Sequence, residues 1–263
     1  MVPETKSPSF QVAETSHPEV SIVIPCLNEE NSIGIVVEKA KRAIETMGVS
    51  GEVVVADNGS TDRSMEIALS KGARVVHVQQ KGYGSALRGG IEAAQGQIIV
   101  IGDADDSYDF LEAPRLVAKV KEGYDLVIGS RFKGQILPGA MPWTSKIGNP
   151  IMTTILNLLF RVNTSDSQSG MRAFTKEAYR KMQLQATGME FASEMLIKAS
   201  KARLKIAEVP ITLHPDKRGH PPHLRPIRDG WRHLKLMLTH SPTVLFLVPG
   251  LFLMLLGLAL MGS

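Results

Sequence analysis

The clearest indication of the fold is an apolar run with acidic residues directly after it, Gln97-Ile98-Ile99-Val100-Ile101-Gly102-Asp103-Ala104-Asp105. The run of apolar, β-branched residues predicts a short buried strand, which the acidic residues that follow bring to an end. Buried strands with polar residues at their carboxyl ends are typical of parallel sheets, where ligands bind at that edge. We therefore expect Asp103 and Asp105 at the ligand-binding edge of a sheet.

Further apolar and amphipathic stretches alternate around this one. Strands that alternate with helices join in parallel through right-handed crossovers, so the predicted class is α/β with a mostly parallel, Rossmann-like sheet flanked by helices. The strands are expected at 20–24, 52–56, 74–78, 97–101 and 126–128. The helices are expected at 32–47, 60–70, 85–95, 114–122 and 188–201.

Composition narrows the classes of protein further. The 263 residues are 43% hydrophobic and 21% charged, as in a globular protein. Cys26 is the single cysteine, which excludes an intrachain disulfide and a cysteine-rich zinc site. The net charge of +4 suits phosphate-bearing partners or an anionic membrane and is too small to imply nucleic acid.

Shifts in composition divide the chain into four segments. Residues 1–18 are polar and predict a mobile tail; they lack the basic start and apolar stretch of a signal peptide, so we expect them in the cytosol. Residues 19–213 form the predicted α/β domain. Residues 214–240 are a basic juxtamembrane segment, and residues 241–263 contain no charge.

The last two segments predict a membrane anchor. At about 1.5 Å per residue, residues 243–261 extend about 28 Å, enough for one transmembrane helix. The preceding segment places Ile227, Trp231, Leu234 and Leu238 on one helical stripe beside a basic face, which is typical of a helix in the cytosolic leaflet. A buried C-terminal helix is the alternative. Because the chain ends soon after the span, we expect more membrane helices in the parent protein.

Two other features leave alternatives open. Residues 147–160 contain no charge and are too short to cross a bilayer, so they predict either a core helix or a second helix in the membrane interface. Five histidines gather in the basic segment, and their spacing matches no zinc signature; a solvated role facing lipid headgroups is favoured over a metal site. They are His214, His220, His223, His233 and His240.

The predicted strand ends supply the candidate chemistry. Asp103 and Asp105 can converge on a hard cation, Mg²⁺ or Mn²⁺, which completes its shell with phosphate oxygens and water. Asp57 follows another strand and can accept from a nucleobase or ribose donor, or cap a turn. The turn at Lys81–Ala86 can cradle phosphate or simply be tight. Glu190 and Glu194 are candidate bases, although a structural or solvated role is favoured.

Seven motifs in this order resemble glycosyltransferase family 2, which has the GT-A fold. Their continuation past Gly129 is similar to the branch that transfers sugars to polyprenyl phosphates, such as dolichyl-phosphate mannose synthases. The likeness covers roughly residues 19–240. The motifs are Pro25…Asn28-Glu29, Asp57-x-Gly-Ser-Thr-Asp62, Gly82-x-Gly-x-Ala86, Asp103-Ala-Asp105, Gly129-Ser-Arg131, Asp166-Ser-Gln-Ser-Gly-Met-Arg172 and Glu208-Val-Pro-Ile211.

The resemblance implies roles for individual residues. Asp103 and Asp105 would hold the metal. The nucleotide-sugar donor would contact Pro25, Asn28, Glu29, Asp57, Gly82 and Asp103. The acceptor phosphate would contact Arg131, Ser169 and Arg172, and the catalytic residues would be Asp105, Arg131 and Arg172. This chain departs from the branch at Ser107, where the branch has Gln, and in the loop after Pro210, where Lys217, Arg218 and Arg225 would clamp the donor diphosphate.

The predicted reaction moves a sugar from a UDP- or GDP-linked donor to a polyprenyl phosphate at the cytosolic face of the cell membrane, by direct inverting displacement. A lipid phosphate is already anionic at neutral pH, so a general base is not required, and cationic groups must hold two anions together. The alternatives are another lipid or glycan acceptor, or a non-catalytic nucleotide-sugar-binding protein. No nucleic-acid partner is expected, and a homo-oligomer is left open.

Overall fold

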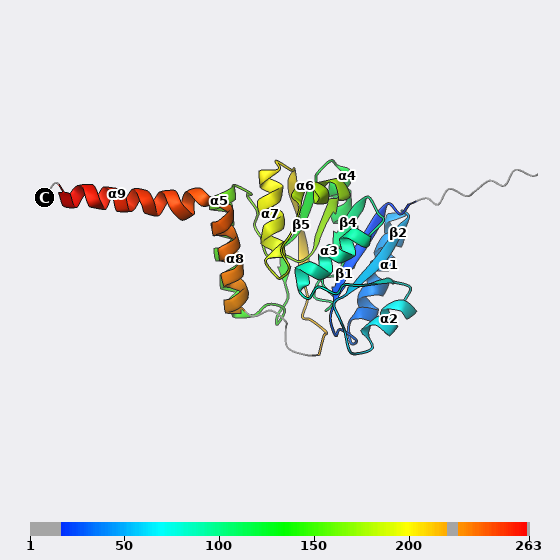
Figure 1. The fold of residues 1–263 in the computed structure, drawn as a ribbon. Helices are drawn as coiled ribbons and strands as arrows, with labels where there is room; N and C mark the ends of the chain where they lie inside the picture. The colour runs from blue at the N-terminus through cyan, green and yellow to red at the C-terminus, as the bar shows by residue number, and fades with distance from the viewer. Residues whose placement is uncertain (1–16, 220–225, 262–263) are drawn as a thin grey trace, which may run out of the picture.

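A computed structural model describes residues 17–219 and 226–261. These form an α/β body from which one helix projects (Figure 1). Almost all of the predicted tail, together with His220, His223 and Arg225, lies outside the described residues, so the predictions for them stay open.

The body is built on one seven-stranded sheet of order β3-β2-β1-β4-β6-β5-β7. Each of the five predicted strands is present, and β1 to β4 pair in parallel, which confirms the mostly parallel α/β class. The strands are β1 (Val20–Cys26), β2 (Gly51–Asp57), β3 (Arg74–His77), β4 (Ile98–Ile101), β5 (Leu126–Ile136), β6 (Arg172–Thr175) and β7 (Ile206–Leu213).

The antiparallel strand β6 lies between β4 and β5 and was not predicted. Its four residues begin with a charged arginine, too short and mixed a pattern to indicate a strand. Arg172 pairs with Ile101 at the end of β4 and with Ile128 of β5. Because β6 runs against its neighbours, the loop that leads into it arrives beside the acidic residues that follow β4. This reversal positions the site.

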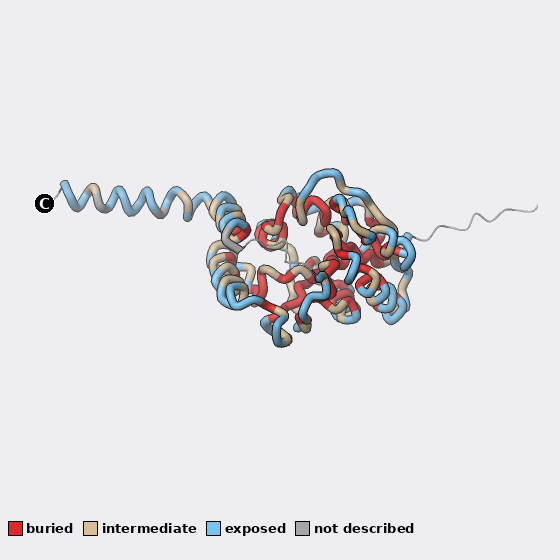
Figure 2. Tube along the Cα trace, turned by 90° about the horizontal axis from the view of Figure 1, so that it is seen from below, coloured by how far each residue is buried: buried red, intermediate tan, exposed pale blue. Residues whose placement is uncertain are grey.

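Helices cover both faces of the sheet, and each face has its own apolar core. Ile33, Val36 and Leu116 belong to the core beneath α1 and α4, whereas Leu87 and Leu196 belong to the core beneath α3 and α7. Figure 2 shows the buried residues gathered in the interior of the body and the exposed residues around its outside. The helices are α1 (Ile33–Met47), α2 (Ser64–Ser70), α3 (Tyr83–Ala93), α4 (Ala113–Lys121), α6 (Lys176–Met182) and α7 (Phe191–Lys201), with a short 3-10 turn at Phe110–Glu112.

Helix α5 (Trp143–Phe160) is only partly covered. Thr153 and Leu156 are buried, and Met152, Ile155 and Leu159 pack against the core that contains Leu196, so one side of α5 is that of a core helix. The opposite side exposes large apolar residues at helical spacing, which fits a helix that meets a membrane. These residues are Trp143, Ile147, Ile151 and Leu158.

Helix α8 (Pro226–His240) packs on the body through a face that was not predicted. Its buried residues Asp229, His233 and Met237 recur every four positions, whereas Trp231 of the predicted apolar stripe is 61% exposed. The expectation of a solvated histidine is therefore wrong for His233, whose Nδ1 lies 2.7 Å from Ser193 Oγ. The body buries the face with Asp229, His233 and Met237, whereas Leu234 and Leu238 of the predicted stripe are half-buried and Trp231 is exposed.

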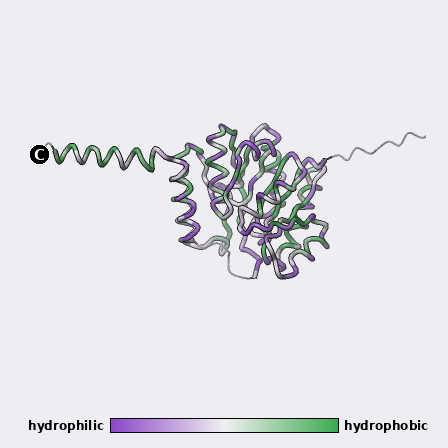
Figure 3. Tube along the Cα trace, viewed as in Figure 1, coloured by the Kyte–Doolittle hydropathy of each residue, from purple (hydrophilic) through white to green (hydrophobic). Residues whose placement is uncertain are grey.

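A π-helix at Thr243–Leu247 leads into helix α9 (Val248–Met261). By length and composition the span Thr243–Met261 could cross a membrane, and none of its most apolar window is buried against the body. The alternative of a buried C-terminal helix is therefore wrong. Figure 3 shows α9 as a largely hydrophobic rod that extends away from the body.

Candidate active site

The carboxyl ends of β1, β2 and β4 meet the loop before β6 at one edge of the sheet. Asp103 is contacted from two sides there. The Tyr83 hydroxyl at the start of α3 donates to Asp103 Oδ1 over 2.8 Å, and a Cβ at Gly170 would lie 2.9 Å from Asp103 Oδ2. Burial and then the negative charge of Asp105 raise the pKa of Asp103 to about 6.

Asp105 is almost completely buried and has both carboxylate oxygens engaged. Oδ1 accepts from the Ser107 backbone N–H over 2.9 Å, and Oδ2 contacts the guanidinium of Arg218. Ser107 thus supports the turn through its backbone. The predicted clamp residue and the predicted metal ligand are direct partners.

The two carboxylates fit a divalent ion that is shared with a substrate. Their mutual repulsion, which contributes to the raised pKa of Asp103, would be relieved by a cation, and carboxylate oxygens are ligands that Mg²⁺ and Mn²⁺ prefer. Among the described residues no group of three or more acidic, histidine or cysteine side chains forms a complete cage. The remaining ligands would be water and diphosphate oxygens.

The loops after β1 and β2 are tied together. Asn28 is in the left-handed conformation at φ 58°. Its side-chain oxygen accepts from the Thr61 N–H over 2.8 Å, and its backbone N–H donates to Ser60 Oγ over 3.0 Å. The backbone N–H of buried Glu29 donates to Ser64 Oγ over 2.7 Å. Pro25 is buried within β1, because the strand continues two residues past its predicted end and finishes at Cys26. Contact of these residues with a donor stays a prediction.

Asp57 is the last residue of β2, and two neighbours hold its carboxylate. Its Oδ1 accepts from the Ser60 N–H over 2.8 Å, and its Oδ2 lies 3.0 Å from Nδ1 of His77. Burial alone would raise the pKa of Asp57, but the hydrogen bonds from Ser60 and His77 outweigh it and lower that pKa. His77 was missed because a histidine at a strand end carries no motif; its ring is 74% exposed beside the carboxylate.

The glycine-rich turn is held against the rest of the site by its backbone. Asn58, inside a motif but without a predicted role, accepts from the Gly82 N–H over 2.7 Å and donates to the carbonyls of Val78 and Gln80. Gly82 has φ 125°, and a Cβ there would lie 2.1 Å from the Thr187 carbonyl oxygen. The tight-turn interpretation explains this glycine; a donor contact stays a prediction.

The guanidinium of Arg131 is held in place by an ion pair with the carboxylate of Asp166. Its Nε and Nη2 each lie 2.7 Å from an Asp166 oxygen, and the residue is 8% exposed. Burial acts to lower the pKa of Arg131, but the electrostatic effect of Tyr108 and the hydrogen bonds and charge of Asp166 raise that pKa overall, so the guanidinium stays charged. The charge of Arg131 acts to lower the pKa of Asp103, and the charge of Asp103 acts to raise the pKa of Arg131.

Arg172 is buried more deeply, with 1% exposure. Its guanidinium donates to three backbone carbonyls, those of Ser169, Ala192 and Ser167, over 2.7 to 3.0 Å. Burial lowers the pKa of Arg172 to about 10. The Ser169 hydroxyl likewise donates to the Gly129 carbonyl. These contacts shape the loop before β6, and direct contact of either side chain with an acceptor stays a prediction.

The two acidic residues at the start of α7 have structural partners. Glu190 pairs with Arg232 of α8 over 2.6 Å. Glu194 accepts from the backbone N–H groups of Gln185 and Ala186 and pairs with Lys198 over 2.8 Å. Neither geometry resembles a poised general base.

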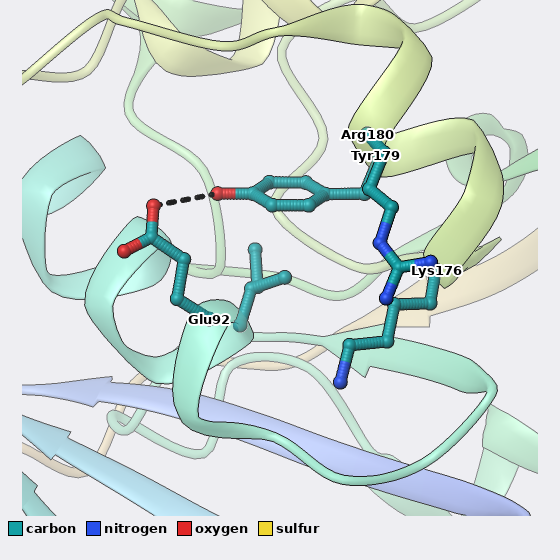
Figure 4. Close-up of a pocket in the computed structure, with 5 residues that line it drawn as sticks. Glu92, Lys176, Tyr179 and Arg180 are labelled. Atoms are coloured by element: carbon teal, nitrogen blue, oxygen red, sulfur yellow. Dashed lines mark hydrogen bonds between the residues drawn. The ribbon is translucent and has the colours of Figure 1, made fainter.

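Figure 4 shows a pocket elsewhere on the body, with a volume of about 280 Å³. Glu92 and Tyr179, whose hydroxyl lies 3.5 Å from the Glu92 carboxylate, are among its lining residues. It lies at the end of α3, about 13 Å along the helix from Tyr83 at the start. None of the predicted site residues lines it, so it is no part of the candidate active site.

The comparisons with known proteins agree with this geometry. Residues 21–183 match glycosyl transferase family 2. The low-salt glycan biosynthesis hexosyltransferase Agl6 of Haloferax volcanii is 46% identical over 242 residues, which cover 91% of this chain and 58% of that protein. The chain thus spans less than two thirds of this relative. A dolichyl-phosphate hexose transferase of the same organism is 32% identical, with 76% of this chain and 85% of that protein covered.

Solved structures give the same fold. Glucosyl-3-phosphoglycerate synthase from Mycobacterium tuberculosis, in complex with Mn²⁺, UDP and phosphoglyceric acid, is 26% identical with a TM-score of 0.66, and the match covers 85% of this chain and 78% of that one. The same synthase in complex with Mg²⁺ and UDP is 25% identical with a TM-score of 0.67, and the match covers 86% of this chain and 80% of that one. The chain belongs to glycosyltransferase family 2. Its fold is the GT-A fold of that family.

Proposed function

We propose that this protein transfers a sugar from a nucleotide-sugar to a polyprenyl phosphate at the cytosolic face of a membrane. The observation that carries the proposal is a combination of two features in one chain. The carboxylates of Asp103 and Asp105 lie at the ligand-binding edge of the sheet, and large apolar side chains on α5, α8 and α9 are exposed. The dolichyl-phosphate hexose transferase to which the chain is similar supports the choice of acceptor.

Each part of the reaction has candidate residues. Asp103, oriented by Tyr83, and Asp105 would hold Mg²⁺ or Mn²⁺, which supplies positive charge to the departing diphosphate. Lys217 and Arg218 would add positive charge on the same side. The acceptor phosphate is anionic and attacks the anomeric carbon directly; the bond to the nucleotide diphosphate breaks and the configuration inverts.

On the acceptor side, Arg131 is the better placed of the two predicted arginines. It acts electrostatically on Asp103 and is slightly exposed, whereas Arg172 is committed to backbone carbonyls. Asp166 fixes the direction of the Arg131 guanidinium through two bonds. A charge held in this way can bring the acceptor phosphate close to the donor without a general base.

The membrane arrangement brings the site to the headgroup level. Trp231 on α8 and Trp143 on α5 are exposed amphipathic rings of the kind that favour the membrane interface. The basic residues of α8 precede the span at Thr243–Met261, which favours a cytosolic position for the body. A lipid phosphate at this level could then reach the sheet edge while its tail stays in hydrocarbon.

The test is transfer from radiolabelled UDP- and GDP-sugars, with Mn²⁺, by the protein in liposomes that contain polyprenyl phosphate. We expect a labelled lipid that mild acid hydrolyses, and none with the matching polyprenol or with diacylglycerol. Label on diacylglycerol instead would move the assignment to the alternative lipid acceptor. No transfer or donor hydrolysis under any of these conditions would favour the non-catalytic alternative.

One neighbour suggests an additional arm for this assay. The synthase structure contains phosphoglyceric acid, a small molecule that also bears a phosphate. Phosphoglyceric acid should therefore be offered in parallel with the lipid. A water-soluble product in place of the lipid product would contradict the polyprenyl-phosphate assignment and leave the donor side intact.

A further inference from the structure

A short strap, His214–Gly219, follows β7 and crosses the acidic loop after β4. Two backbone bonds fasten it: the His214 N–H donates to the Ser107 carbonyl and the Lys217 N–H to the Asp105 carbonyl, each over 2.9 Å. Asn31 Nδ2 donates to the Arg218 carbonyl over 3.1 Å. The backbone of the strap is thus anchored on both sides of Arg218, and the position of its side chain follows from that of Asp105.

Arg218 occupies the place where a cation would be expected. Its side chain is 14% exposed, its Nη2 contacts Asp105 Oδ2, and its Nε lies 3.4 Å from Asp216 Oδ1. A guanidinium and a divalent ion on the same carboxylate oxygen would repel each other strongly at low exposure. Arg218 and a metal ion therefore compete for Asp105.

We propose that Arg218 is a built-in counter-ion of Asp105 that exchanges with the divalent metal, and that the released guanidinium then contacts the donor diphosphate. This inference rests on the proposed function of the site. The diphosphate offers Arg218 a second anion within reach of a long, flexible side chain whose backbone stays anchored. Metal alone must displace Arg218 without compensation, whereas metal and nucleotide together replace the lost partner.

The exchange predicts cooperative binding. Nucleotide diphosphate should raise the affinity for Mn²⁺, and Mn²⁺ should raise the affinity for nucleotide by the same factor, because coupling between two ligands is reciprocal. Removal of the guanidinium should change the two affinities in opposite directions. Substitution of a residue with a purely structural role would weaken both affinities or neither of them.

Lys217 provides a matched control on the same strap. Its ammonium pairs with Asp106 Oδ2 over 2.7 Å rather than with Asp105, and its side chain is 53% exposed. Asp106 retains a second cation, Lys39, at 2.8 Å. Lys217→Gln therefore removes the same charge from the same segment but leaves the Asp105 contact in place.

The experiment measures Mn²⁺ binding to the full chain in detergent by electron paramagnetic resonance of free Mn²⁺, without nucleotide, and then UDP and GDP binding by calorimetry with Mn²⁺ present. For Arg218→Gln we expect Mn²⁺ alone to bind on the order of tenfold more tightly and the preferred nucleotide on the order of tenfold more weakly. Arg218→Lys should restore part of both effects. Lys217→Gln should leave the affinity for Mn²⁺ alone within about twofold.

Unchanged or weaker Mn²⁺ binding by Arg218→Gln would overturn the exchange, provided that its thermal unfolding matches that of the parent protein. An equal gain in Lys217→Gln would also overturn it, because general charge would then explain the result. No acceptor is present in these titrations. If the parent protein binds Mn²⁺ and nucleotide cooperatively but transfers sugar to no lipid phosphate, the proposed function fails and the exchange stands.

Discussion

At the scale of single residues, Asp105 interacts with three neighbours at the acidic edge of the sheet. It receives the Ser107 N–H, contacts Arg218 and lies close enough to Asp103 to affect its pKa. Asp105→Asn should abolish transfer, because the amide carries no charge to hold the metal and offers it a single oxygen. Turnover and Mn²⁺-dependent donor binding would be measured together.

Asp109→Asn is the matched control for that change. Asp109 caps the following 3-10 turn by accepting from the Leu111 N–H, and asparagine can do the same. This variant should keep its activity. Near-normal turnover of Asp105→Asn, with an unchanged metal requirement, would contradict the assignment of the site.

Arg172 supports a different prediction, about stability. Arg172→Ala leaves three backbone carbonyls of a buried loop without their donors, and each unsatisfied buried group costs about 1–3 kcal/mol. We expect the free energy of unfolding to fall by several kcal/mol in urea denaturation. Arg115→Ala, which removes an exposed pair with Glu112, should cost at most about 1 kcal/mol. Normal stability with lost use of the acceptor would instead show that Arg172 binds phosphate directly.

At the scale of elements, the contact between α7 and α8 contains a buried histidine. Burial lowers the pKa of His233 from 6.5 to about 4, although the charges of Glu190 and Asp229 oppose this. The unfolded chain therefore takes up the proton first as the pH falls. The stability that neutral His233 contributes is fully present above about 6.5 and is lost as the pH falls through about 4.

His233→Asn tests this dependence. The amide can still hydrogen-bond to Ser193 but does not titrate. We expect the parent protein to lose more stability than the variant between pH 6.5 and pH 4, by on the order of 2–3 kcal/mol. The measurement is urea unfolding at several pH values. Curves that stay parallel across this range would rule out His233 as the source.

At the scale of the whole molecule, we expect two segments to contribute to membrane attachment. These are helix α8 and the span at Thr243–Met261. Deletion of residues 241–263 should leave a protein that still binds anionic vesicles, with an affinity that falls as salt rises. When Arg228→Glu and Lys235→Glu are added to the truncated protein, we expect that it no longer binds the vesicles. Arg232 is left unchanged because its ion pair with Glu190 holds α8 on the body. Vesicle co-sedimentation across a salt series measures both effects.

The control carries the same charge change on a distant helix. Arg63→Glu with Lys71→Glu alters the two ends of α2, on the opposite side of the body from α8 (Figure 1). This variant should bind vesicles more weakly than the truncated parent but remain bound at low salt. If the truncated parent does not bind vesicles at any ionic strength, the C-terminal span is the anchor and α8 is a helix that only packs on the body.

What the sequence alone determined is the part of the protein that depends on local pattern. Apolar runs of strand length predicted the parallel strands, and the acidic residues after β4 predicted an oxygen-rich edge, because burial and periodicity are properties of neighbouring residues. The uncharged stretch at Thr243–Met261 predicted an exposed apolar helix for the same reason. The ordered motifs identified the family.

Only the tertiary structure decided which partners each polar group has. The antiparallel β6 brought Arg131–Asp166 and the Arg172 loop to the acidic edge through pairings with β4 and β5, which no local pattern encodes. The strap placed Arg218 on Asp105, 113 positions away in the chain. On α8 the body buried His233 and left Trp231 exposed, because a helix with two usable faces is oriented by the neighbour it packs against and not by its own periodicity.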